Sequence, residues 1–248
     1  MEQTTSLVTG ASRGIGRALA RVLASQGHRV ILLARDTPSL REATAEVQSL
    51  SPSSFALPCD LASPESIQEA AKHCISQVQR LDVLVHNAGA ISPIQPLLAA
   101  DADAWARSMQ VNVIGVQHLT AALAGVLQGE HRVRITTISS GASQRPLPSW
   151  SAYCTAKAAL DMWTRCLAAE GANQNISAIS IAPGIVDTEM QREIRTASSD
   201  DFPLQATFQA YHENGDLTDP DEVAQRLTPL ITEHEMEQSG QRFDVRDL

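Results

Sequence analysis

The chain has 248 residues and 43% hydrophobic content, enough for one large buried core. Its formal net charge of -9 at pH 7 argues against nucleic acid or an anionic membrane as the main partner. The sequence has no apolar run of membrane-spanning length and no signal-peptide pattern at its start, so we expect a cytoplasmic protein with one domain over residues 1–248.

Apolar strand-like runs alternate with amphipathic helical stretches along the chain. Predicted strands at 6–8, 29–33, 54–57, 82–86, 133–138 and 176–181 precede predicted helices at 15–26, 39–50, 64–79, 103–127, 151–170 and 219–232, with a last strand at 241–245. Such alternation implies right-handed crossovers and a mostly parallel sheet covered on both faces. The predicted fold is α/β, a single-domain, doubly wound Rossmann fold with seven strands and its ligands at their carboxyl ends.

The turn after the first predicted strand is rich in glycine. Gly10, Gly14 and Gly16 lie in the segment 9–16, just before a predicted helix. Glycines let the backbone bend tightly and let a pyrophosphate approach the helix N-terminus, where free N–H groups favour an anion. This placement predicts a site for a nicotinamide dinucleotide.

The end of the second predicted strand discriminates between cofactors. An acidic residue there would bind the ribose 2′-hydroxyl of NAD, but this chain has Arg35, with Arg13 inside the glycine turn. Two guanidinium groups that converge make a phosphate site, which predicts NADP, with NADPH preferred over NADH. Asp36 could pair with Arg35 or face solvent, and Arg35 could itself be a solvated loop residue.

Tyr153 and Lys157 are four residues apart in a predicted helix and therefore share one face. A neighbouring ammonium can lower the pKa of a phenol from about 10 towards neutrality. Such a phenol can give a proton to a carbonyl oxygen or take one from an alcohol. The pair therefore indicates a carbonyl/alcohol oxidoreductase.

Together these features resemble the short-chain dehydrogenase/reductase family, in its compact branch. The resemblance covers essentially the whole chain. It rests on the motifs T-G-x-x-x-G-x-G at 9–16, N-A-G at 87–89 and P-G-x-V-x-T at 183–188, and on Asp60, Asn112, Ser140, Tyr153 and Lys157. His86 stands where the family often has another asparagine.

The resemblance implies a role for each matched residue. The implied catalytic residues are Asn112, Ser140, Tyr153 and Lys157. Tyr153 would be the general acid and Ser140 would bind the substrate carbonyl, while Lys157 would hold the nicotinamide ribose and Asn112 a relay water. Besides Tyr153 and Lys157, the implied cofactor-binding residues are Gly10, Ser12, Arg13, Gly14, Ile15, Gly16, Arg35, Asp60, Leu61, Asn87, Ala88, Gly89, Pro183, Gly184, Ile185 and Thr188.

Several of these assignments have alternatives. Ser139 competes with Ser140, although the family spacing to the tyrosine selects Ser140. Asn112 could satisfy a backbone kink, with or without a relay. Asp60 could cap the next helix, although Ser63 ahead of Pro64 is the better candidate.

No metal-site spacing occurs in the sequence, and no metal is expected. The spacing of the four cysteines fits neither metal ligands nor a redox pair, which predicts reduced thiols at Cys59, Cys74, Cys154 and Cys166.

The substrate end is less sharply defined by the sequence. The long segment 187–215 spaces apolar and aromatic residues through polar sequence and predicts a lid of one or two short helices. The segment 141–150, with Leu147 and Trp150, would form the opposite wall. These walls suit a carbonyl compound without a large charged group, although plain core packing uses the same residue types.

The segments 183–195 and 239–244 are similar to the sepiapterin reductase and benzil reductase-like subgroup. In sepiapterin reductases an aspartate at the position of Asp244 anchors the pterin; here it could do so or bond neighbouring backbone. The resemblance implies an NADPH-dependent reductase of a ketone or diketone. The alternatives are an NADP-dependent alcohol dehydrogenase of a biosynthetic pathway and a non-catalytic NADP(H)-sensing protein. Helices apolar on more than one side favour a homodimer or homotetramer.

Overall fold

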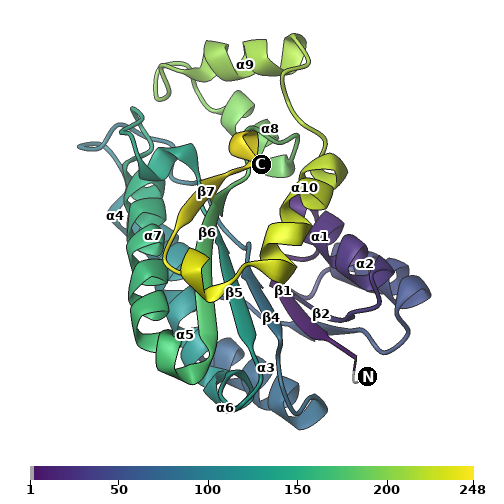
Figure 1. The fold of residues 1–248 in the computed structure, drawn as a ribbon. Coiled ribbons are helices and arrows are strands. Elements are labelled where there is room, and N and C mark those ends of the chain that lie inside the picture. The colour runs from purple at the N-terminus through teal and green to yellow at the C-terminus, as the bar shows by residue number, and fades with distance from the viewer. Residues whose placement is uncertain (1–2) are drawn as a thin grey trace.

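The computed structural model describes residues 3–248, which form a seven-stranded sheet with helices on both faces (Figure 1). The spatial order is β3-β2-β1-β4-β5-β6-β7, and every adjacent pair is parallel. The strands are β1 (Thr5–Thr9), β2 (Arg29–Ala34), β3 (Phe55–Pro58), β4 (Val83–His86), β5 (Val133–Ile138), β6 (Ile176–Ala182) and β7 (Arg242–Asp244). The doubly wound α/β prediction is confirmed, and the reversal of strand order lies between β1 and β4.

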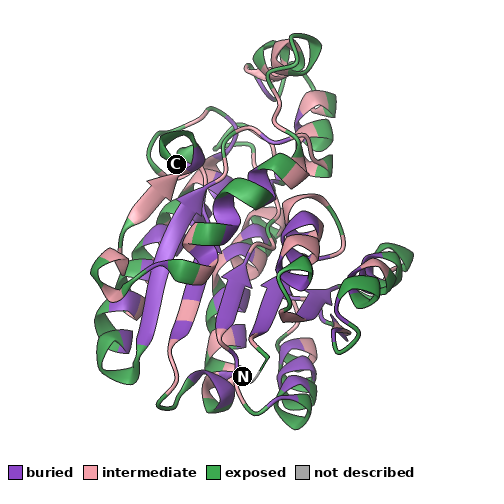
Figure 2. Cartoon of the chain, turned by 45° about the vertical axis from the view of Figure 1, so that its right-hand side comes forward, coloured by how far each residue is buried: buried purple, intermediate pink, exposed green. Residues whose placement is uncertain are grey.

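Two apolar layers enclose the sheet, because alternate strand residues point to opposite faces. One face packs against α1 (Gly14–Ser25), α2 (Pro38–Leu50) and α10 (Pro220–Glu233). The other packs against α3 (Pro64–Gln77), α5 (Gly115–Ala122), α6 (Ala124–Leu127) and the end of α7 (Ser151–Gly171). Figure 2 shows the result: buried strands run between helices whose outer sides are exposed.

Several helices begin where capping chemistry predicts. Thr37 and Ser63 accept hydrogen bonds from the first turns of α2 and α3, and a proline follows each cap. The side chain of Asp101 likewise accepts a hydrogen bond from the first turn of α4 (Ala102–Met109). Ser63, and not Asp60, is therefore the cap of α3.

The predicted helix over 103–127 is interrupted. After α4 the chain forms a π-helical turn, η1 (Gln110–Ile114), and only then continues as α5 and α6. Such a turn widens the helix by one residue and commonly occurs at functional sites. It places Asn112 in the interior, with 1% of its surface exposed.

The segment 187–215 forms two short helices, α8 (Glu189–Thr196) and α9 (Gln205–Glu213), as predicted. They lie beyond the carboxyl ends of the strands, with α9 farther from the sheet (Figure 1). Over the described residues no helix is both long and apolar enough to cross a membrane.

Candidate active site

The glycine turn between β1 and α1 has backbone angles and close contacts that exclude side chains at its glycines. Gly10 and Gly14 have φ angles of 66° and 54°, which L-residues with side chains rarely adopt. A Cβ at Gly16 would lie 2.3 Å from the Gly10 carbonyl oxygen and 2.5 Å from Nδ2 of Asn87. The turn therefore needs glycine at these positions.

The start of α1 has the chemistry of an anion site. Its N-cap residue, Arg13, makes no side-chain capping bond, and the first turn contains no acidic residue. The first N–H groups of the helix and its dipole therefore favour a negative group. The residues present fit the pyrophosphate of a dinucleotide.

Arg13 and Arg35 are brought to the same end of the sheet, because the amide of Ala11 donates to the carbonyl of Leu33 near the end of β2 at 3.2 Å. Both arginines are exposed, and neither guanidinium has a polar partner among residues 3–248. Asp36 pairs with Arg41 at 2.7 Å and leaves Arg35 available. These two cations fit a phosphate on the adenosine ribose.

Asp60 and Leu61 follow β3, on the path expected for the adenine. Leu61 is buried, and Asp60 accepts from the amide of Ala62 at 2.9 Å. The other carboxylate oxygen of Asp60 lies 3.9 Å from the guanidinium of Arg107. The Asp60 carboxylate can therefore accept a further hydrogen bond at this edge of the sheet.

Asn87, Ala88 and Gly89 tie the end of β4 to the end of β1. The hydroxyl of Thr9 accepts from the amides of Asn87 and Ala88, each at 3.0 Å, and the Asn87 side chain donates to the Thr9 carbonyl at 2.9 Å. The π turn adds a second tie, since Asn112 donates to the carbonyl of Ala90 and accepts from its amide, both at 2.9 Å. Asn112 therefore has a structural role, since it holds the loop after β4 against the π turn.

Ser140, Tyr153 and Lys157 converge beside this loop. The phenol of Tyr153 lies close enough to the Ser140 side chain for the serine to lower its pKa. The Lys157 ammonium lies 5.6 Å from the centre of the Tyr153 ring and donates to the carbonyl of Ile138 at 2.7 Å. A Cβ placed on Gly89 would lie 3.6 Å from the same ammonium. Ser139 instead donates to Ser143 at 3.4 Å, which leaves Ser140 as the serine of the group.

The pKa of Tyr153 moves opposite to the sequence-based expectation. Burial raises it to about 12, and the Ser140 side chain lowers it only in part. Tyr153 is 7% exposed, so loss of water outweighs the neighbouring groups. Burial also lowers the pKa of Lys157 to about 8, while the nearby Asp161 carboxylate raises it. The phenol is consequently protonated through neutral pH, as a proton donor requires.

The segment 183–188 runs back towards the glycine turn. Gly184 has a φ angle of 78°, and the carbonyl of Ile185 accepts from the amide of Thr218 at 2.9 Å. Thr188 is so close to the turn that a Cβ on Gly14 would lie 3.2 Å from its methyl group. These residues can contact the nicotinamide end of a dinucleotide that begins at α1.

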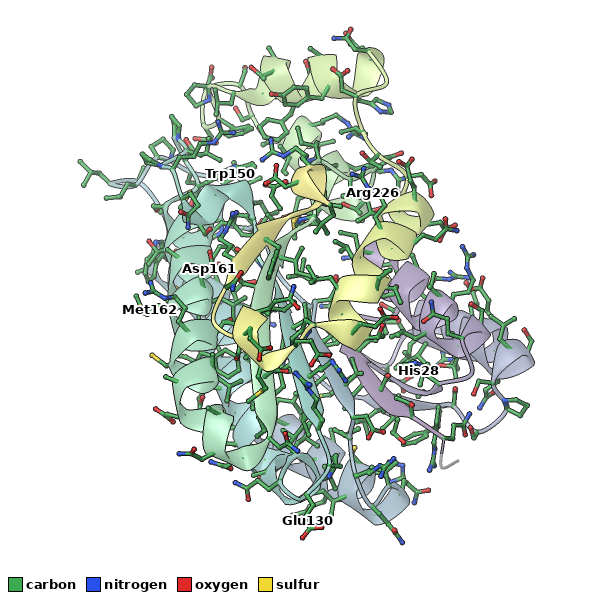
Figure 3. All side chains as sticks on the ribbon, viewed as in Figure 1. His28, Glu130, Trp150, Asp161, Met162 and Arg226 are labelled. Carbon is green, nitrogen blue, oxygen red and sulfur yellow. The ribbon has the colours of Figure 1, made fainter. Side chains whose placement is uncertain are left out.

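An aromatic cluster covers the substrate end. Trp150 stacks on Phe202 with ring centres 5.4 Å apart and meets the ring of Tyr153 edge-on at 5.7 Å. Phe208 of α9 packs against both Trp150 and Phe202, at 5.2 and 5.6 Å. The predicted walls, 141–150 and 187–215, therefore meet in one apolar cluster beside the phenol (Figure 3 labels Trp150).

Two polar groups lie near this end of the site: Asp244, which the sequence singles out, and Arg242, which it does not. Asp244 bonds the backbone amide of Arg246 at 3.1 Å and its guanidinium at 2.7 and 2.6 Å. Arg242 donates to the main-chain carbonyl of Ser140 at 3.1 Å and pairs with Asp161 at 3.3 Å. No motif marks Arg242 or Asp161, and only their offsets from Asp244 and Lys157 could have drawn attention to them.

Across residues 3–248 no group of three or more histidine, cysteine or acidic side chains could hold a metal ion. The four cysteines are free. Burial raises the pKa of the Cys59 and Cys74 thiols to about 11, so these two are poor nucleophiles.

Comparison with known proteins agrees with this geometry. The family model for short chain dehydrogenase matches residues 4–199. A benzil reductase ((S)-benzoin forming) of Bacillus cereus is 30% identical over 239 residues, which is 94% of this chain and 95% of the relative. The solved structure of the KRED1-Pglu enzyme has a TM-score of 0.88 at 30% identity, covering 97% of this chain and all of that one. A short chain dehydrogenase of Escherichia coli CFT073, complexed with NADPH, has a TM-score of 0.84 at 26% identity, covering 99% and 98%.

Proposed function

The chain belongs to the short-chain dehydrogenase family and is an oxidoreductase of C=O and CH–OH groups; on that basis we propose that it is an NADPH-dependent carbonyl reductase that reduces a ketone or diketone. The observation that carries the proposal is the convergence of Ser140, Tyr153 and Lys157 beside the loop at Gly89.

In this proposal, a bound nicotinamide dinucleotide supplies the hydride. Tyr153 donates its phenolic proton to the carbonyl oxygen, which its raised pKa permits at neutral pH. The Ser140 hydroxyl hydrogen-bonds the same oxygen and stabilises its developing negative charge. Lys157 places a positive charge next to the phenol and stabilises the phenolate left after proton transfer. Asn112 holds the segment at Ala90 in place. The proposal also gives Asn112 a bound water that passes protons between Lys157 and solvent.

The cofactor contacts follow from position. Gly10, Ser12, Gly14, Ile15 and Gly16 form the pyrophosphate platform. Arg13 and Arg35 bind the 2′-phosphate and give NADPH its preference over NADH. Asp60 and Leu61 contact the adenine, and the ribose and nicotinamide are held by Asn87, Ala88, Gly89, Tyr153, Lys157, Pro183, Gly184, Ile185 and Thr188. Relatives crystallised with NADP or NADPH support the choice of cofactor.

The substrate we propose is an uncharged carbonyl compound with aromatic or apolar substituents. The side chains beside Tyr153 are Trp150, Phe202 and Ile91, all at most 4% exposed. Benzil reductases among the relatives support an aromatic diketone. Asp244 is already paired with Arg246, which argues against pterin anchoring.

Because Tyr153 is nearly enclosed, residues 187–215 act as a lid that moves to admit substrate.

We further propose that the working molecule is a homodimer or homotetramer. Ile114, beside α5, and Met162, on α7, are 41% and 53% exposed although both are large and apolar. A second copy would cover them.

The test is NADPH oxidation in the presence of benzil, other vicinal diketones, quinones, sepiapterin and simple ketones. We expect turnover with aromatic diketones and slower turnover with NADH. Tight binding of NADPH with no reduction of any carbonyl would instead favour a protein that only senses the dinucleotide. Faster oxidation of the matching alcohols with NADP would favour the dehydrogenase direction.

A further inference from the structure

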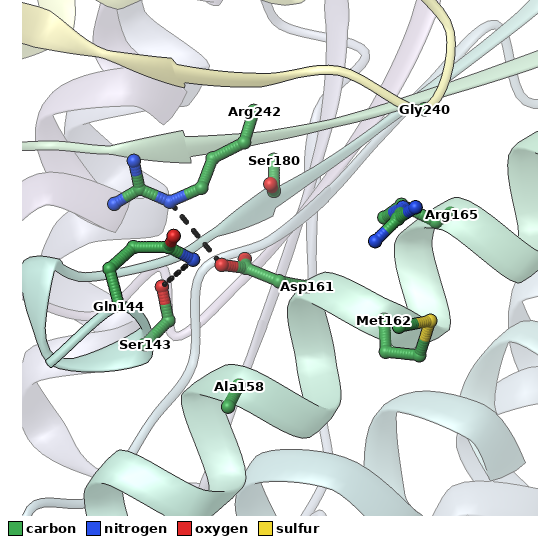
Figure 4. Close-up of a pocket in the computed structure, with 9 residues that line it drawn as sticks. All are labelled: Ser143, Gln144, Ala158, Asp161, Met162, Arg165, Ser180, Gly240 and Arg242. Atoms are coloured by element: carbon green, nitrogen blue, oxygen red, sulfur yellow. Dashed lines mark hydrogen bonds and ion pairs between the residues drawn. The ribbon is translucent and has the colours of Figure 1, made fainter. Parts of the chain in front are cut away.

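A partly buried ion pair lies next to the main chain of Ser140. The Nε atom of Arg242, on β7, is 3.3 Å from a carboxylate oxygen of Asp161, on α7 (Figure 4). The Asp161 side chain is 11% exposed and that of Arg242 is 25% exposed. Neither carboxylate oxygen has a hydrogen-bond partner among the described residues. The charge of Asp161 is therefore little shielded by hydrogen bonding.

Arg242 makes a second contact, and it is with the catalytic loop. Its Nη2 atom donates to the main-chain carbonyl of Ser140 at 3.1 Å. One rigid, planar guanidinium thus joins the segment that carries Ser140 to the helix that carries Tyr153 and Lys157. Movement of Arg242 would change the position of Ser140 relative to the phenol.

Asp161 is placed to act on Lys157. It follows Lys157 by four residues on α7, so the two side chains leave the same face of the helix one turn apart. Both are buried, with 8% and 3% of their surfaces exposed. The Asp161 carboxylate and the Lys157 ammonium attract each other more strongly here than in bulk water, because burial excludes water from both.

Packing alone does not account for the pair. Asp161 and Arg242 border a cavity of about 370 Å³ that Gln144, Met162 and Arg165 also line. A buried carboxylate without hydrogen bonds, such as that of Asp161, costs desolvation free energy that an apolar side chain of the same size would not. A charged pair beside a cavity therefore needs a reason other than stability.

We propose that Asp161 and Arg242 are positioning residues of the reductase, in which Arg242 fixes the main chain of Ser140 and Asp161 keeps a negative charge one turn from Lys157. This inference rests on the proposed function, since it assigns the pair a part in that reaction.

The surroundings of Lys157 define the expected effect. Tyr153 and Asp161 face it from α7, Asn112 from the π turn and the Ile138 carbonyl from β5. Burial lowers its pKa to about 8, and among residues 3–248 Asp161 is the charged group that raises it. Arg242 acts on Lys157 by partly neutralising Asp161. Loss of Asp161 should therefore lower the pKa of Lys157, and loss of the Arg242 charge should raise it.

The first experiment measures this pKa directly. The chain has two lysines, Lys72 and Lys157, so the side-chain NMR signals of ¹³C-labelled lysine can be assigned and titrated. In Asp161→Asn we expect the Lys157 pKa to fall by about one unit, and in Arg242→Gln to rise. Exposed Lys72 is the internal reference. Unchanged titration of Lys157 in both folded variants would overturn the electrostatic part of the proposal, whether or not the protein reduces carbonyls.

The second experiment is the pH profile of kcat for NADPH-dependent reduction. Asp161→Asn should shift the alkaline loss of activity to lower pH and reduce kcat on the order of tenfold at mildly alkaline pH. Arg242→Gln should lower kcat and shift that loss to higher pH, while Arg242→Lys should restore the profile but only part of kcat. Arg165→Gln removes a guanidinium that lines the same cavity without bonding Ser140 or Asp161, and it should change neither.

The outcomes separate the two proposals. A wild-type protein that reduces no carbonyl removes the proposed function, and the lysine titration still decides whether the pair acts on Lys157. If Asp161→Asn does not fold, the opposite shift in Arg242→Gln decides the point. Lower melting temperatures in both variants, with kcat and its pH profile unchanged, would make the pair a packing element only.

Discussion

The glycine turn and the aromatic cluster of Trp150, Phe202 and Phe208 bring different kinds of atoms together. At the turn, main-chain atoms meet: a side chain on Gly16 would contact the Gly10 carbonyl at 2.3 Å. In the aromatic cluster, side chains meet: the rings pack with their centres 5.2–5.6 Å apart. Main-chain packing allows one residue type, whereas many apolar combinations can form a cluster. The first region can therefore be recognised from a motif, and the second needs a structure.

The two regions also differ in how firmly they are held. The turn lies between β1 and α1, where Val8, Ala11 and Leu19 are completely buried. The helices of the proposed lid, α8 and α9, are short, and neither has a side-chain cap at its start. Low local burial and missing caps are typical of segments that open locally. The predictions below separate the chemical centre, the cofactor end and the lid.

The largest effect is expected at the point where the regions meet. Tyr153→Phe removes the proton donor and keeps the ring against Trp150. We expect kcat to fall about 10²- to 10⁴-fold, as for loss of a general acid, with NADPH affinity within a few-fold. Steady-state kinetics and fluorescence titration of NADPH measure both. Normal turnover in this variant would remove Tyr153 from the mechanism.

A smaller effect should be confined to the cofactor end. Arg35→Ala removes one of two exposed cations near the glycine turn, and NADPH affinity should fall about 10- to 100-fold while NADH affinity changes little. Arg41→Ala is the matched control, because Arg41 is paired with Asp36 instead. Equal losses for NADPH and NADH would place the 2′-phosphate elsewhere.

A still smaller effect should be confined to the lid. Phe202→Ala opens the stack on Trp150, so we expect KM for an aromatic diketone to rise about tenfold, with NADPH affinity nearly constant. Amide exchange in α9 should become faster, while exchange in α1 should not. Faster exchange in both helices would show that the lid and the cofactor end are one cooperative unit.

The effect that should be smallest at neutral pH concerns stability and belongs to neither region. His86 is buried against Trp163, and burial lowers its pKa to about 3. A neutral buried histidine contributes stability above its unfolded pKa of about 6.5, and this is lost as pH falls towards 3. His86→Asn should therefore flatten the fall in unfolding free energy over that interval, measured by urea denaturation. His28 and His234, whose pKa values are also lowered by burial, should preserve part of the slope.

The order of strands and helices could be predicted because each element carries its own signal. The caps at Thr37 and Ser63 and the prolines that follow them mark helix starts, and apolar runs mark the strands. The π turn at Gln110–Ile114 could not be predicted, because it depends on the bonds that Asn112 makes with a loop far along the chain. Periodicity within a helix contains no such information.

The candidate site divides in the same way. Motif spacing placed Ser140, Tyr153 and Lys157 in one group, and the structure brings them together. The direction of the Tyr153 pKa shift was wrong, because sequence spacing indicates the neighbouring charge but not the depth of burial. Arg242 was missed since its contact with Ser140 joins residues 102 positions apart.

The crowding at Gly16 also bears on how cofactor choice can change. A side chain at Gly10 or Gly16 would collide with main-chain atoms, so these two positions of the proposed dinucleotide platform can hardly change. Arg13 and Arg35 project into solvent and can be replaced without disturbing that platform. With the proposed 2′-phosphate site at these two arginines, selection or engineering can move this scaffold between the two cellular pools of reducing equivalents by exchanging surface charges alone.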